Sequence, residues 1–436
     1  MNKILGIVKE TKNEWERRVP LIPGDIKDIL ARQPLEFVIQ PSKRRVFTDE
    51  EFKSVGVQIR ADLSNCDIIL GIKEIKIPHL LPNKVYLYFS HTIKGQFYNM
   101  PMLQKLLDLN CTLIDYECIS DEQGQRLIYF SLHAGLAGII DSLWAFGQRL
   151  NWEAIPSPFK KIKQAYHYGS LTEAQEAFKK LGAEITDSGL PDEITPLVIG
   201  ITGYGNVSRG VQQLLDMLPV TMIEPKDLKE LKFRKGDLSR TVFKVVFKEQ
   251  DMFEPVALDA HFDLQEYYYY PEKYRSKFEK YLPYLSILVN ASFWDTPYPK
   301  HVTKSFLKKL FSAKSPPSLK VIGDISCDID GGVECTLKAT DPGNPIYSYD
   351  AINEKALDGF TNIGPVVIAV DNLPCELPLD ASIHFSSMLK PLIPDLIKTD
   401  FSVSFKELML PDKLKNAVIV HKGQLTPEYC YLKEYL

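Results

Sequence analysis

The sequence predicts an α/β protein of two Rossmann-like domains, each with a mostly parallel β-sheet flanked by helices. Three observations support this prediction. Short apolar runs rich in β-branched residues alternate with longer segments of helical period through the first half of the chain. A second series of the same kind begins after a long segment of small residues. The length of 436 residues is enough for two or three domains with full hydrophobic cores.

The first series opens the chain. Its strands are expected at five apolar runs, namely Ile4–Val8, Phe37–Ile39, Ile68–Ile72, Val85–Phe89 and Thr112–Asp115. Helices are expected between them, at Pro23–Arg32, Asp49–Val55 and Met102–Leu109. The segment His133–Gly147 follows, and its glycines and alanines allow a helix to pack closely against another backbone. We expect this helix to lead into the second domain.

The second series starts with an amphipathic helix from Leu171, which Gly182 is expected to end. Its strands are expected at Leu197–Thr202, Val220–Ile223, Ser286–Asn290 and Leu319–Ile325. The charged segment 226–285 is expected to be an insertion with local helices over the sheet edge. A helix at Ala381–Leu389 would return the chain to the first domain. The predicted domains are 1–132 plus 375–436 for substrate and catalysis, and 133–374 for a dinucleotide.

Composition excludes several classes of protein. With 52 Lys and Arg against 56 Asp and Glu, the net charge of -4 argues against a protein that coats nucleic acid. The apolar runs are far shorter than the roughly 20 residues of a membrane-spanning helix, and the one at the N-terminus is too short for a signal peptide. Seven cysteines without a C-x-x-C pair favour reduced thiols over disulfides or a zinc site. We therefore expect a soluble cytoplasmic protein.

A glycine motif is the most informative local pattern. Gly203 and Gly205 follow the buried run Leu197–Thr202 directly, and a helix begins after them. In this order the first glycine allows a tight turn, the second lets the backbone approach a pyrophosphate, and the helix N-terminus attracts its charge. Ser208 stands at the third position of G-x-G-x-x-G. The alternative is a glycine-rich turn that binds nothing.

The next strand of this domain ends at Glu224, about 20 residues after the glycines. An acidic side chain there accepts hydrogen bonds from the ribose 2′-hydroxyl, so Glu224 favours NAD. Lys226, Lys229 and Arg234 lie nearby and could instead neutralise a 2′-phosphate. These residues leave the choice of cofactor open.

In the first domain, polar side chains follow several expected strands. Arg18 follows the first strand and could hold a carboxylate, although a solvated surface arginine is the alternative. Lys73 and His91 follow two neighbouring strands, where burial lowers a lysine pKa towards the working range of a histidine. Glu117 lies on the same rim. We expect Lys73 and His91 to pass protons, with a capping or packing role as the alternative for His91.

The strand at Val321–Ile325 ends in polar residues. Asp324, Asp328 and Asp330 have neither the spacing nor the terminal glutamate of an EF-hand calcium loop, so we expect no metal here. Carboxylates and hydroxyls at this strand end, Ser326 among them, fit the nicotinamide side of a cofactor better.

Seven segments of the chain, in order, resemble one known family. They are residues 15–21 (WERRVPL), 39–45 (IQPSKRR), 89–94 (FSHTIK), 113–117 (LIDYE), 203–210 (GYGNVSRG), 324–326 (DIS) and 371–374 (DNLP). The resemblance is to the lysine-2-oxoglutarate reductase domain, the N-terminal half of aminoadipate semialdehyde synthase in animals and plants. More distantly, the chain is similar to fungal lysine-forming saccharopine dehydrogenase and to alanine dehydrogenase.

The resemblance implies two α/β domains with the active site in the cleft between them, and condensation of L-lysine with 2-oxoglutarate to saccharopine, or the reverse. Lys73 and His91 match the acid/base pair, Arg18 matches a substrate-carboxylate ligand, and Glu74 and Glu117 match carboxylates that tune them. The implied cofactor is NADP in preference to NAD. The implied cofactor contacts are Gly203, Gly205, Asn206, Val207, Ser208, Glu224, Asp324, Ser326, Asp328 and Asp371.

The chain departs from this family at two points. Ser131 replaces a usual glycine in the segment that begins at Phe130, and no saccharopine-cleaving domain follows, which implies a stand-alone form. Two other functions stay open. One is reductive amination of another 2-oxo acid with ammonia, as in alanine dehydrogenase, and the other is a silent NAD(P)-binding protein. A homo-oligomer is compatible with either.

Overall fold

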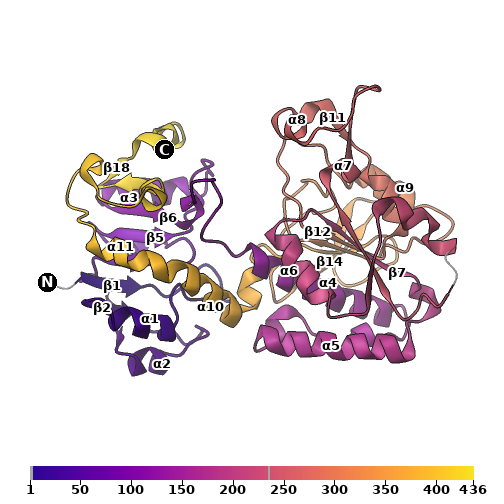
Figure 1. The fold of residues 1–436 in the computed structure, drawn as a ribbon, viewed down its shortest axis with the longest axis horizontal. Helices are drawn as coiled ribbons and strands as arrows, with labels where there is room; N and C mark the ends of the chain where they lie inside the picture. Colours follow the sequence, from indigo (N-terminus) through magenta and orange to yellow (C-terminus); the bar gives the residue numbers. More distant parts are fainter. Residues whose placement is uncertain (1–2, 234–235) are drawn as a thin grey trace. The chain divides into compact units, whose positions relative to one another are not determined.

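A computed structural model describes residues 3–233 and 236–436. The chain forms two compact units, one of residues 1–130 and 378–436 and the other of residues 131–377. Figure 1 shows both, with the two ends of the chain in the same unit. The predicted boundaries lie at 132/133 and 374/375, whereas these units divide at 130/131 and 377/378.

Unit 1 contains an eight-stranded sheet in the order β18-β17-β6-β5-β4-β1-β2-β3. Its strands are β1 (Lys3–Ile7), β2 (Leu35–Ile39), β3 (Gln58–Ile59), β4 (Ile68–Leu70), β5 (Val85–Tyr88), β6 (Thr112–Asp115), β17 (Val418–His421) and β18 (Gln424–Leu425). Strands β1 to β6 are parallel, β17 runs antiparallel to β6, and β18 antiparallel to β17. The alternating strands and helices predicted for this unit are confirmed.

The helices of unit 1 come from both ends of the chain. They are α1 (Pro23–Leu30), α2 (Asp49–Ser54), α3 (Met100–Asp108), α10 (Pro378–Leu389), α11 (Ile393–Lys398) and α12 (Asp412–Lys415). Helix α10 is tied to the segment before α1, because Ser382 Oγ accepts from Val19 N–H and Ser386 Oγ accepts from Ile22 N–H, both at 3.0 Å. The C-terminal segment therefore helps to hold the loop that carries Arg18.

Unit 2 contains a second eight-stranded sheet, in the order β15-β14-β16-β13-β12-β7-β9-β8. Its strands are β7 (Leu197–Thr202), β8 (Val220–Met222), β9 (Val242–Phe247), β12 (Ile287–Asn290), β13 (Val321–Asp324), β14 (Ile346–Asp350), β15 (Lys355–Leu357) and β16 (Val366–Ile368). Strand β14 runs antiparallel to β15 and β16, and the other pairings are parallel. Both units thus have the predicted α/β class.

The two faces of this sheet carry separate apolar cores. Helices α4 (Ser131–Trp152), α5 (Leu171–Ser188) and α6 (Asn206–Leu215) pack on one face. The other face carries α7 (Glu249–Met252), α9 (Lys304–Phe311) and part of the insertion. In Figure 1 the insertion, with α8 (Leu264–Tyr269), β10 (Phe253–Pro255) and β11 (Tyr274–Ser276), extends from unit 2 at the top.

Helices α4 and α6 approach each other closely, as the small residues of α4 predict. A Cβ atom on Gly135 would lie 1.9 Å from Val207 O, and one on Gly210 would lie 2.2 Å from Leu132 O. Neither position tolerates a side chain without separating the helices.

The structure differs from the sequence prediction at several elements, and two of these differences concern α5 and the central sheet of unit 2. Gly182 does not end α5, which continues to Ser188 and is followed by Gly189 at φ 76°. Gly182 instead faces Met217, whose O atom would lie 2.9 Å from an added Cβ. The larger difference is β9, a strand within the segment expected to hold only local helices. It lies inside the sheet, between β7 and β8.

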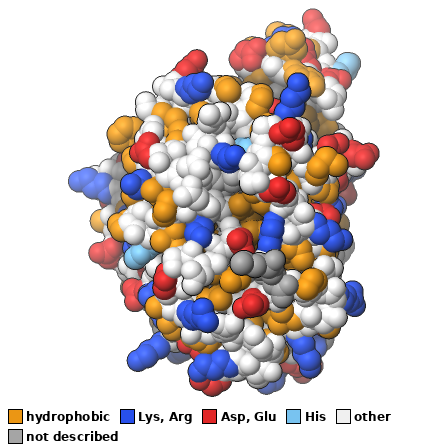
Figure 2. All heavy atoms as spheres, turned by 90° about the vertical axis from the view of Figure 1, so that its left-hand side faces the viewer, with side chains coloured by type: hydrophobic (Ala, Val, Ile, Leu, Met, Phe, Trp, Pro, Cys, Tyr) orange, Lys and Arg blue, Asp and Glu red, His pale blue; other side chains and the backbone are white. Residues whose placement is uncertain are grey.

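No helix among the described residues is both long and apolar enough to cross a membrane. On the face drawn in Figure 2, basic and acidic side chains are interspersed, as the small net charge of -4 suggests.

Candidate functional site

Three neighbouring parallel strands of unit 1 end in titratable side chains. Glu10 follows β1, Lys73 follows β4 and His91 follows β5, and these strands are adjacent in the order β5-β4-β1. A cavity of about 310 Å³ is lined by Glu10, Lys73 and Glu74, among others. The carboxyl edge of the sheet therefore gathers acids and bases, as the strand endings predict.

His91 is held by Glu74. Its Nδ1 atom lies 2.6 Å from Glu74 Oε1, and Lys12 Nζ lies 3.5 Å from the same oxygen. Burial alone would raise the pKa of Glu74, but the hydrogen bond and charge of His91, with Lys12, lower this pKa to about 2. The backbone of His91 has a positive φ of 49°, and its carbonyl accepts from Asn99 Nδ2 at 3.1 Å. Glu74 is therefore ionised near neutral pH, and its carboxylate orients the ring of His91.

Lys73 is buried beside charged groups. Burial lowers its pKa, and the positive charge of Arg18 lowers it further. Its backbone N–H donates to Glu10 Oε2 at 3.2 Å, and Ile72 N–H donates to Glu10 Oε1 at 2.6 Å. Burial, with the charge of Glu16, raises the pKa of Glu10 to about 8. No motif in the sequence marks Glu10, although it follows β1 closely, as Lys73 follows β4.

Arg18 is 2% exposed and forms a forked ion pair. Its Nε donates to Glu16 Oε1 at 2.7 Å and its Nη2 to Glu16 Oε2 at 2.5 Å. The guanidinium lies 4.1 Å from the centre of the Phe130 ring, which stacks on Phe385. The proposed contact of Arg18 with a substrate carboxylate stays a prediction, and Glu16 is the partner that the structure shows.

Glu117 has different hydrogen-bond partners from the Glu74–His91 pair. Its Oε1 accepts from Arg126 Nη2 at 2.8 Å. Its backbone N–H donates to Asp115 Oδ1 at 2.8 Å, and the other carboxylate oxygen of Asp115 accepts from Ser90 N–H at 3.1 Å. Burial raises the pKa of Asp115 to about 6. The tuning role of Glu117 stays a prediction. Asp115 links the loop of Glu117 to that of His91.

In unit 2, the glycine turn has the backbone that its motif predicts. Gly203 has φ 79°, and a Cβ there would lie 3.1 Å from Ala291 O. At Gly205 an added Cβ would meet nothing within 4 Å, so space is open in front of the turn. Asn206 and Val207 begin α6, whose first turn has no side-chain cap from Gly205. Its N–H groups are thus available to an anion.

Ser208 and the ends of neighbouring strands are polar but buried. Ser208 Oγ accepts from Gln212 Nε2 at 3.1 Å. Asn290, at the end of β12, accepts from Thr202 Oγ1 at 2.6 Å and donates to Asp324 Oδ1 at 2.8 Å and to Ser326 Oγ at 3.0 Å. The structure therefore brings Asp324 and Ser326 together around Asn290, which no local sequence motif identifies.

His301 completes this network. Its Nε2 lies 3.1 Å from Asn290 Oδ1, and burial lowers its pKa to about 4. His301 is therefore neutral near pH 7 and supports the strand ends without adding charge. Its position in a loop far along the chain explains why no local pattern identifies it.

Three predicted cofactor residues lie outside this network. Glu224 is exposed beyond β8, and Asp328 and Asp371 are also exposed. Arg234, considered as a phosphate ligand, lies outside the described residues. Within the described part of the chain, no group of three or more His, Cys, Asp or Glu side chains could hold a metal ion.

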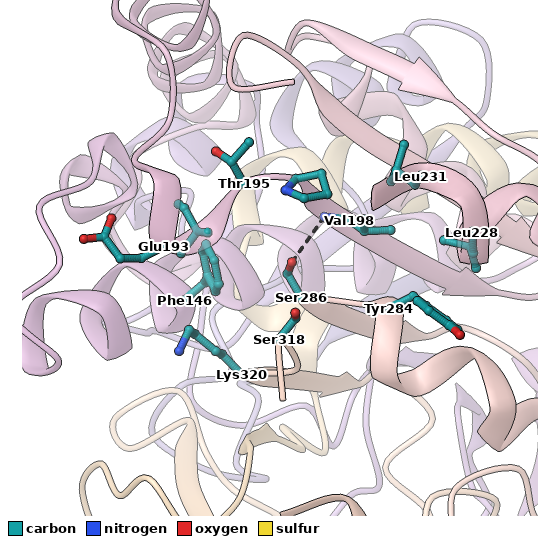
Figure 3. A pocket seen from close by; sticks show the side chains of 12 residues that line it. Phe146, Glu193, Thr195, Val198, Leu228, Leu231, Tyr284, Ser286, Ser318 and Lys320 are labelled. Carbon is teal, nitrogen blue, oxygen red and sulfur yellow. Dashed lines mark hydrogen bonds between the residues drawn. The ribbon is translucent and has the colours of Figure 1, made fainter. Parts of the chain in front are cut away.

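A second cavity, of about 280 Å³, lies in unit 2 at the opposite edge of the sheet (Figure 3). Ile194, Thr195 and Pro196 precede β7 and line it, together with Ser286 before β12 and Lys320 before β13. Ser286 Oγ accepts from Val198 N–H at 3.2 Å. The cavity is thus at the amino ends of the strands, and the glycine turn is at their carboxyl ends.

Comparison with known proteins gives a family match for the N-terminal part of the chain and relatives along nearly its whole length. Residues 6–137 match the family "Alanine dehydrogenase/PNT, N-terminal domain". The chain is 38% identical to alpha-aminoadipic semialdehyde synthase of Arabidopsis thaliana over 99% of its own length and 41% of that protein. It is 33% identical to the mitochondrial enzyme of that name from Bos taurus, again over 99% of this chain and 48% of that protein. The chain therefore spans less than half the length of these relatives.

Similarity to the fungal enzyme and to solved structures extends over nearly whole chains. Identity to the saccharopine dehydrogenase [NAD(+), L-lysine-forming] of Yarrowia lipolytica is 25%, over 91% of this chain and 93% of that protein. The fold matches L-alanine dehydrogenase with a TM-score of 0.62 at 16% identity, covering 99% of this chain and all of that one. It matches the transhydrogenase of Sinorhizobium meliloti with a TM-score of 0.56 at 14% identity, covering 97% and 100%.

The comparisons thus show similarity along 99% of the chain to alpha-aminoadipic semialdehyde synthase and, at lower identity, to saccharopine dehydrogenase. Residues 6–137 match the model of the alanine dehydrogenase/PNT N-terminal domain.

Proposed function

We propose that this protein is an oxidoreductase that condenses L-lysine with 2-oxoglutarate to saccharopine, or catalyses the reverse reaction, with NADP(H) or NAD(H). One observation carries the proposal. Lys73 and the Glu74–His91 pair, which match the acid/base groups of the related dehydrogenases, stand together at the carboxyl edge of one sheet. The names of the relatives support the same reaction.

The residues of unit 2 fit a dinucleotide. The space in front of Gly205 and the uncapped first turn of α6 suit a pyrophosphate group, which needs close backbone approach and N–H donors. We propose that Gly203, Gly205, Asn206, Val207 and Ser208 form this contact. When bound, a nicotinamide cofactor supplies or accepts the hydride.

The reaction needs proton transfers that Lys73 and His91 can supply. The ε-amine of the substrate lysine attacks the keto carbon of 2-oxoglutarate, loses a proton, and the keto oxygen gains one to give a carbinolamine. Loss of water then gives an imine, whose carbon is reduced and whose nitrogen gains a proton. A lowered pKa makes Lys73 a better proton acceptor near neutral pH. His91, with Nδ1 held by Glu74, presents Nε2 for the other transfers.

The carboxylates of 2-oxoglutarate and of L-lysine also need compensating charge. Arg18 supplies positive charge at this edge, and Glu16 holds it in place. We propose that a substrate carboxylate is drawn to the guanidinium of Arg18 while Glu16 remains its partner.

A second candidate function is reductive amination of a 2-oxo acid with ammonia. The match of residues 6–137 to the alanine dehydrogenase/PNT N-terminal domain favours it. The two reactions share a hydride donor and an imine, and they differ in the amine.

Initial rates distinguish these functions. Oxidation of NADPH and of NADH would be followed with 2-oxoglutarate plus either L-lysine or ammonia. We expect lysine to support oxidation. If only ammonia does, the lysine proposal is wrong. If neither amine does while NADPH still binds in a fluorescence titration, the protein is a non-catalytic dinucleotide binder. The cytoplasmic location and a homo-oligomer stay predictions, and three related enzymes are named mitochondrial.

A further inference from the structure

The strand beside the glycine turn is β9. In dinucleotide-binding sheets, the side chain that meets the adenosine ribose stands at the carboxyl end of the strand next to the one that carries the glycine turn. Here β7 pairs with β9 in parallel register from Leu197↔Val242 to Thr202↔Phe247. Gly203 N–H donates to Phe247 O at 2.9 Å. The residues after Phe247 therefore lie directly beside the turn.

Glu224 lies one strand further away. Strand β8 pairs with β9, and its last residue, Met222, is opposite Lys244. At about 4.8 Å between strands, β8 lies roughly 10 Å from β7. Glu224 is exposed at this outer edge. The spacing along the chain suggests that Glu224 contacts the adenosine ribose. The position in the sheet instead assigns this contact to the residue at the end of β9.

Lys248 occupies that position. It is exposed and extended, with φ -95° and ψ 169°, so it continues the side-chain alternation of β9. Lys244, four residues earlier and on the same face, forms an ion pair with Asp216 at the C-terminal end of α6. Four strand residues span about 13 Å, and the ten residues of α6 span about 15 Å. Lys248 is therefore level with the N-terminus of α6, where the pyrophosphate would bind.

The carboxylate next to Lys248 is engaged by tyrosines. Glu249 Oε1 accepts from Tyr268 Oη at 3.0 Å, and Tyr204, within the glycine turn, lies close to both. These hydroxyls bind Glu249 on the side of the insertion. Lys248 is exposed, and its ammonium is a charged group available to a ligand at the end of β9.

We propose that Lys248 binds the 2′-phosphate of the cofactor and so selects NADP(H) over NAD(H). The inference rests on the proposed dinucleotide site and adds the residue that distinguishes a phosphorylated from an unphosphorylated adenosine ribose. A lysine ammonium meets a phosphate through charge-assisted hydrogen bonds, which are about twice as strong as neutral ones. An unphosphorylated ribose offers Lys248 only hydroxyl acceptors.

The test uses binding of nucleotide fragments to the whole protein, without turnover. Adenosine 2′,5′-bisphosphate and ADP would be titrated calorimetrically into wild type, Lys248→Gln, Glu224→Gln and Lys226→Gln. Wild type should bind the 2′-phosphorylated fragment the more tightly. Lys248→Gln should weaken that fragment by about tenfold or more and ADP by less than threefold. Lys226→Gln removes the same charge beyond β8, and both it and Glu224→Gln should change the ratio of the two affinities by less than threefold.

Each other result contradicts the inference. An unchanged ratio in Lys248→Gln, or an equal loss in Lys226→Gln, would place phosphate recognition elsewhere. A wild-type protein that binds ADP more tightly than the bisphosphate would keep the dinucleotide site and remove the phosphate contact. If wild type binds neither fragment, the dinucleotide site itself is wrong.

Discussion

Lys73 owes its chemistry to its surroundings. An exposed lysine is almost fully protonated at neutral pH, whereas burial and the charge of Arg18 lower the pKa of Lys73. Glu10 accepts from its backbone N–H, and Glu74 beside it holds His91. These contacts come from three strands, so each residue depends on the sheet to meet the others.

We predict that Lys73→Met lowers kcat by about 10²-fold, the usual contribution of one general acid/base. The substitution preserves the length of the side chain and removes its proton. A lysine whose folded pKa lies below its unfolded pKa loses stability as pH falls, so the apolar variant should unfold at the same or a higher temperature near pH 7. Steady-state kinetics and thermal unfolding measure the two effects.

Lys9→Met is the matched control, because Lys9 is exposed and lines the same cavity. It should leave kcat within about twofold, well under the 10²-fold scale of a general acid/base. Equal losses in both variants would show that charge in the cavity, and not proton transfer by Lys73, limits the rate.

At the scale of single elements, the two glycines of the glycine turn are needed for different reasons. Gly203 needs a positive φ and close contact with Ala291, whereas Gly205 only borders open space. We predict that Gly205→Ala folds with an unchanged melting temperature but binds NADPH at least tenfold more weakly, because its methyl group fills the space of the pyrophosphate. Fluorescence titration and thermal unfolding measure both properties.

Gly203→Ala provides the contrast. It should lower stability by about 1 kcal/mol or more, since an alanine is strained at this φ. If Gly205→Ala bound NADPH as tightly as wild type, the turn would not be the pyrophosphate site.

A pair of buried carboxyl groups joins two other elements. Asp141 on α4 and Glu376, at the end of the 3₁₀ helix Leu373–Glu376, are both 1% exposed or less. Burial raises the pKa of each, and the charge of Asp141 raises that of Glu376 further. A raised folded pKa means that stability is fully present below the unfolded value near 4.5 and is lost as pH rises.

We therefore predict that Glu376→Gln raises the melting temperature at pH 8 by about 3 °C or more, the effect of roughly 1 kcal/mol in a unit of this size. At pH 5 the gain should be smaller, because the acid is then protonated in the folded protein. Glu193→Gln, at an exposed position of the same unit, should change neither value. A larger loss at pH 8 than at pH 5 would contradict the prediction, since it would mean that a charged Glu376 stabilises the fold.

At the scale of the whole molecule, the two units differ in continuity. Unit 2 is one continuous segment, whereas unit 1 needs both ends of the chain. Strand β17 covers the edge of β6, and Ser382 and Ser386 of α10 bind the loop that holds Arg18. Without residues 378–436, β6 would become an uncovered edge strand.

We predict that a fragment of residues 131–377 folds cooperatively, as judged by circular dichroism and thermal unfolding, while residues 1–130 alone aggregate or lack a cooperative transition. Adding residues 378–436 as a separate chain should restore solubility to the first fragment. A monomeric, cooperatively folded 1–130 fragment would show that the C-terminal segment is dispensable for this unit.

Much of the fold follows from local patterns. The strand Leu197–Thr202 and the turn at Gly203 need only apolar β-branched residues, glycines and a following helix, all within about 20 residues. The strand ends that carry Lys73 and His91 were identified in the same way. Strand β9 does not stand out in the sequence, because the apolar run Val242–Phe247 lies within a charged segment.

The sequence alone determined the α/β class, the positions of half of the described strands and the glycine turn, because backbone preference and hydrophobic period act over short distances. Only the tertiary structure decided that β9 separates β7 from Glu224 and that Glu74 holds His91. It also decided that Arg18 pairs with Glu16. Strand order and burial depend on contacts between residues far apart in the chain, and those contacts set both the pKa values and the side chains that can meet a ligand.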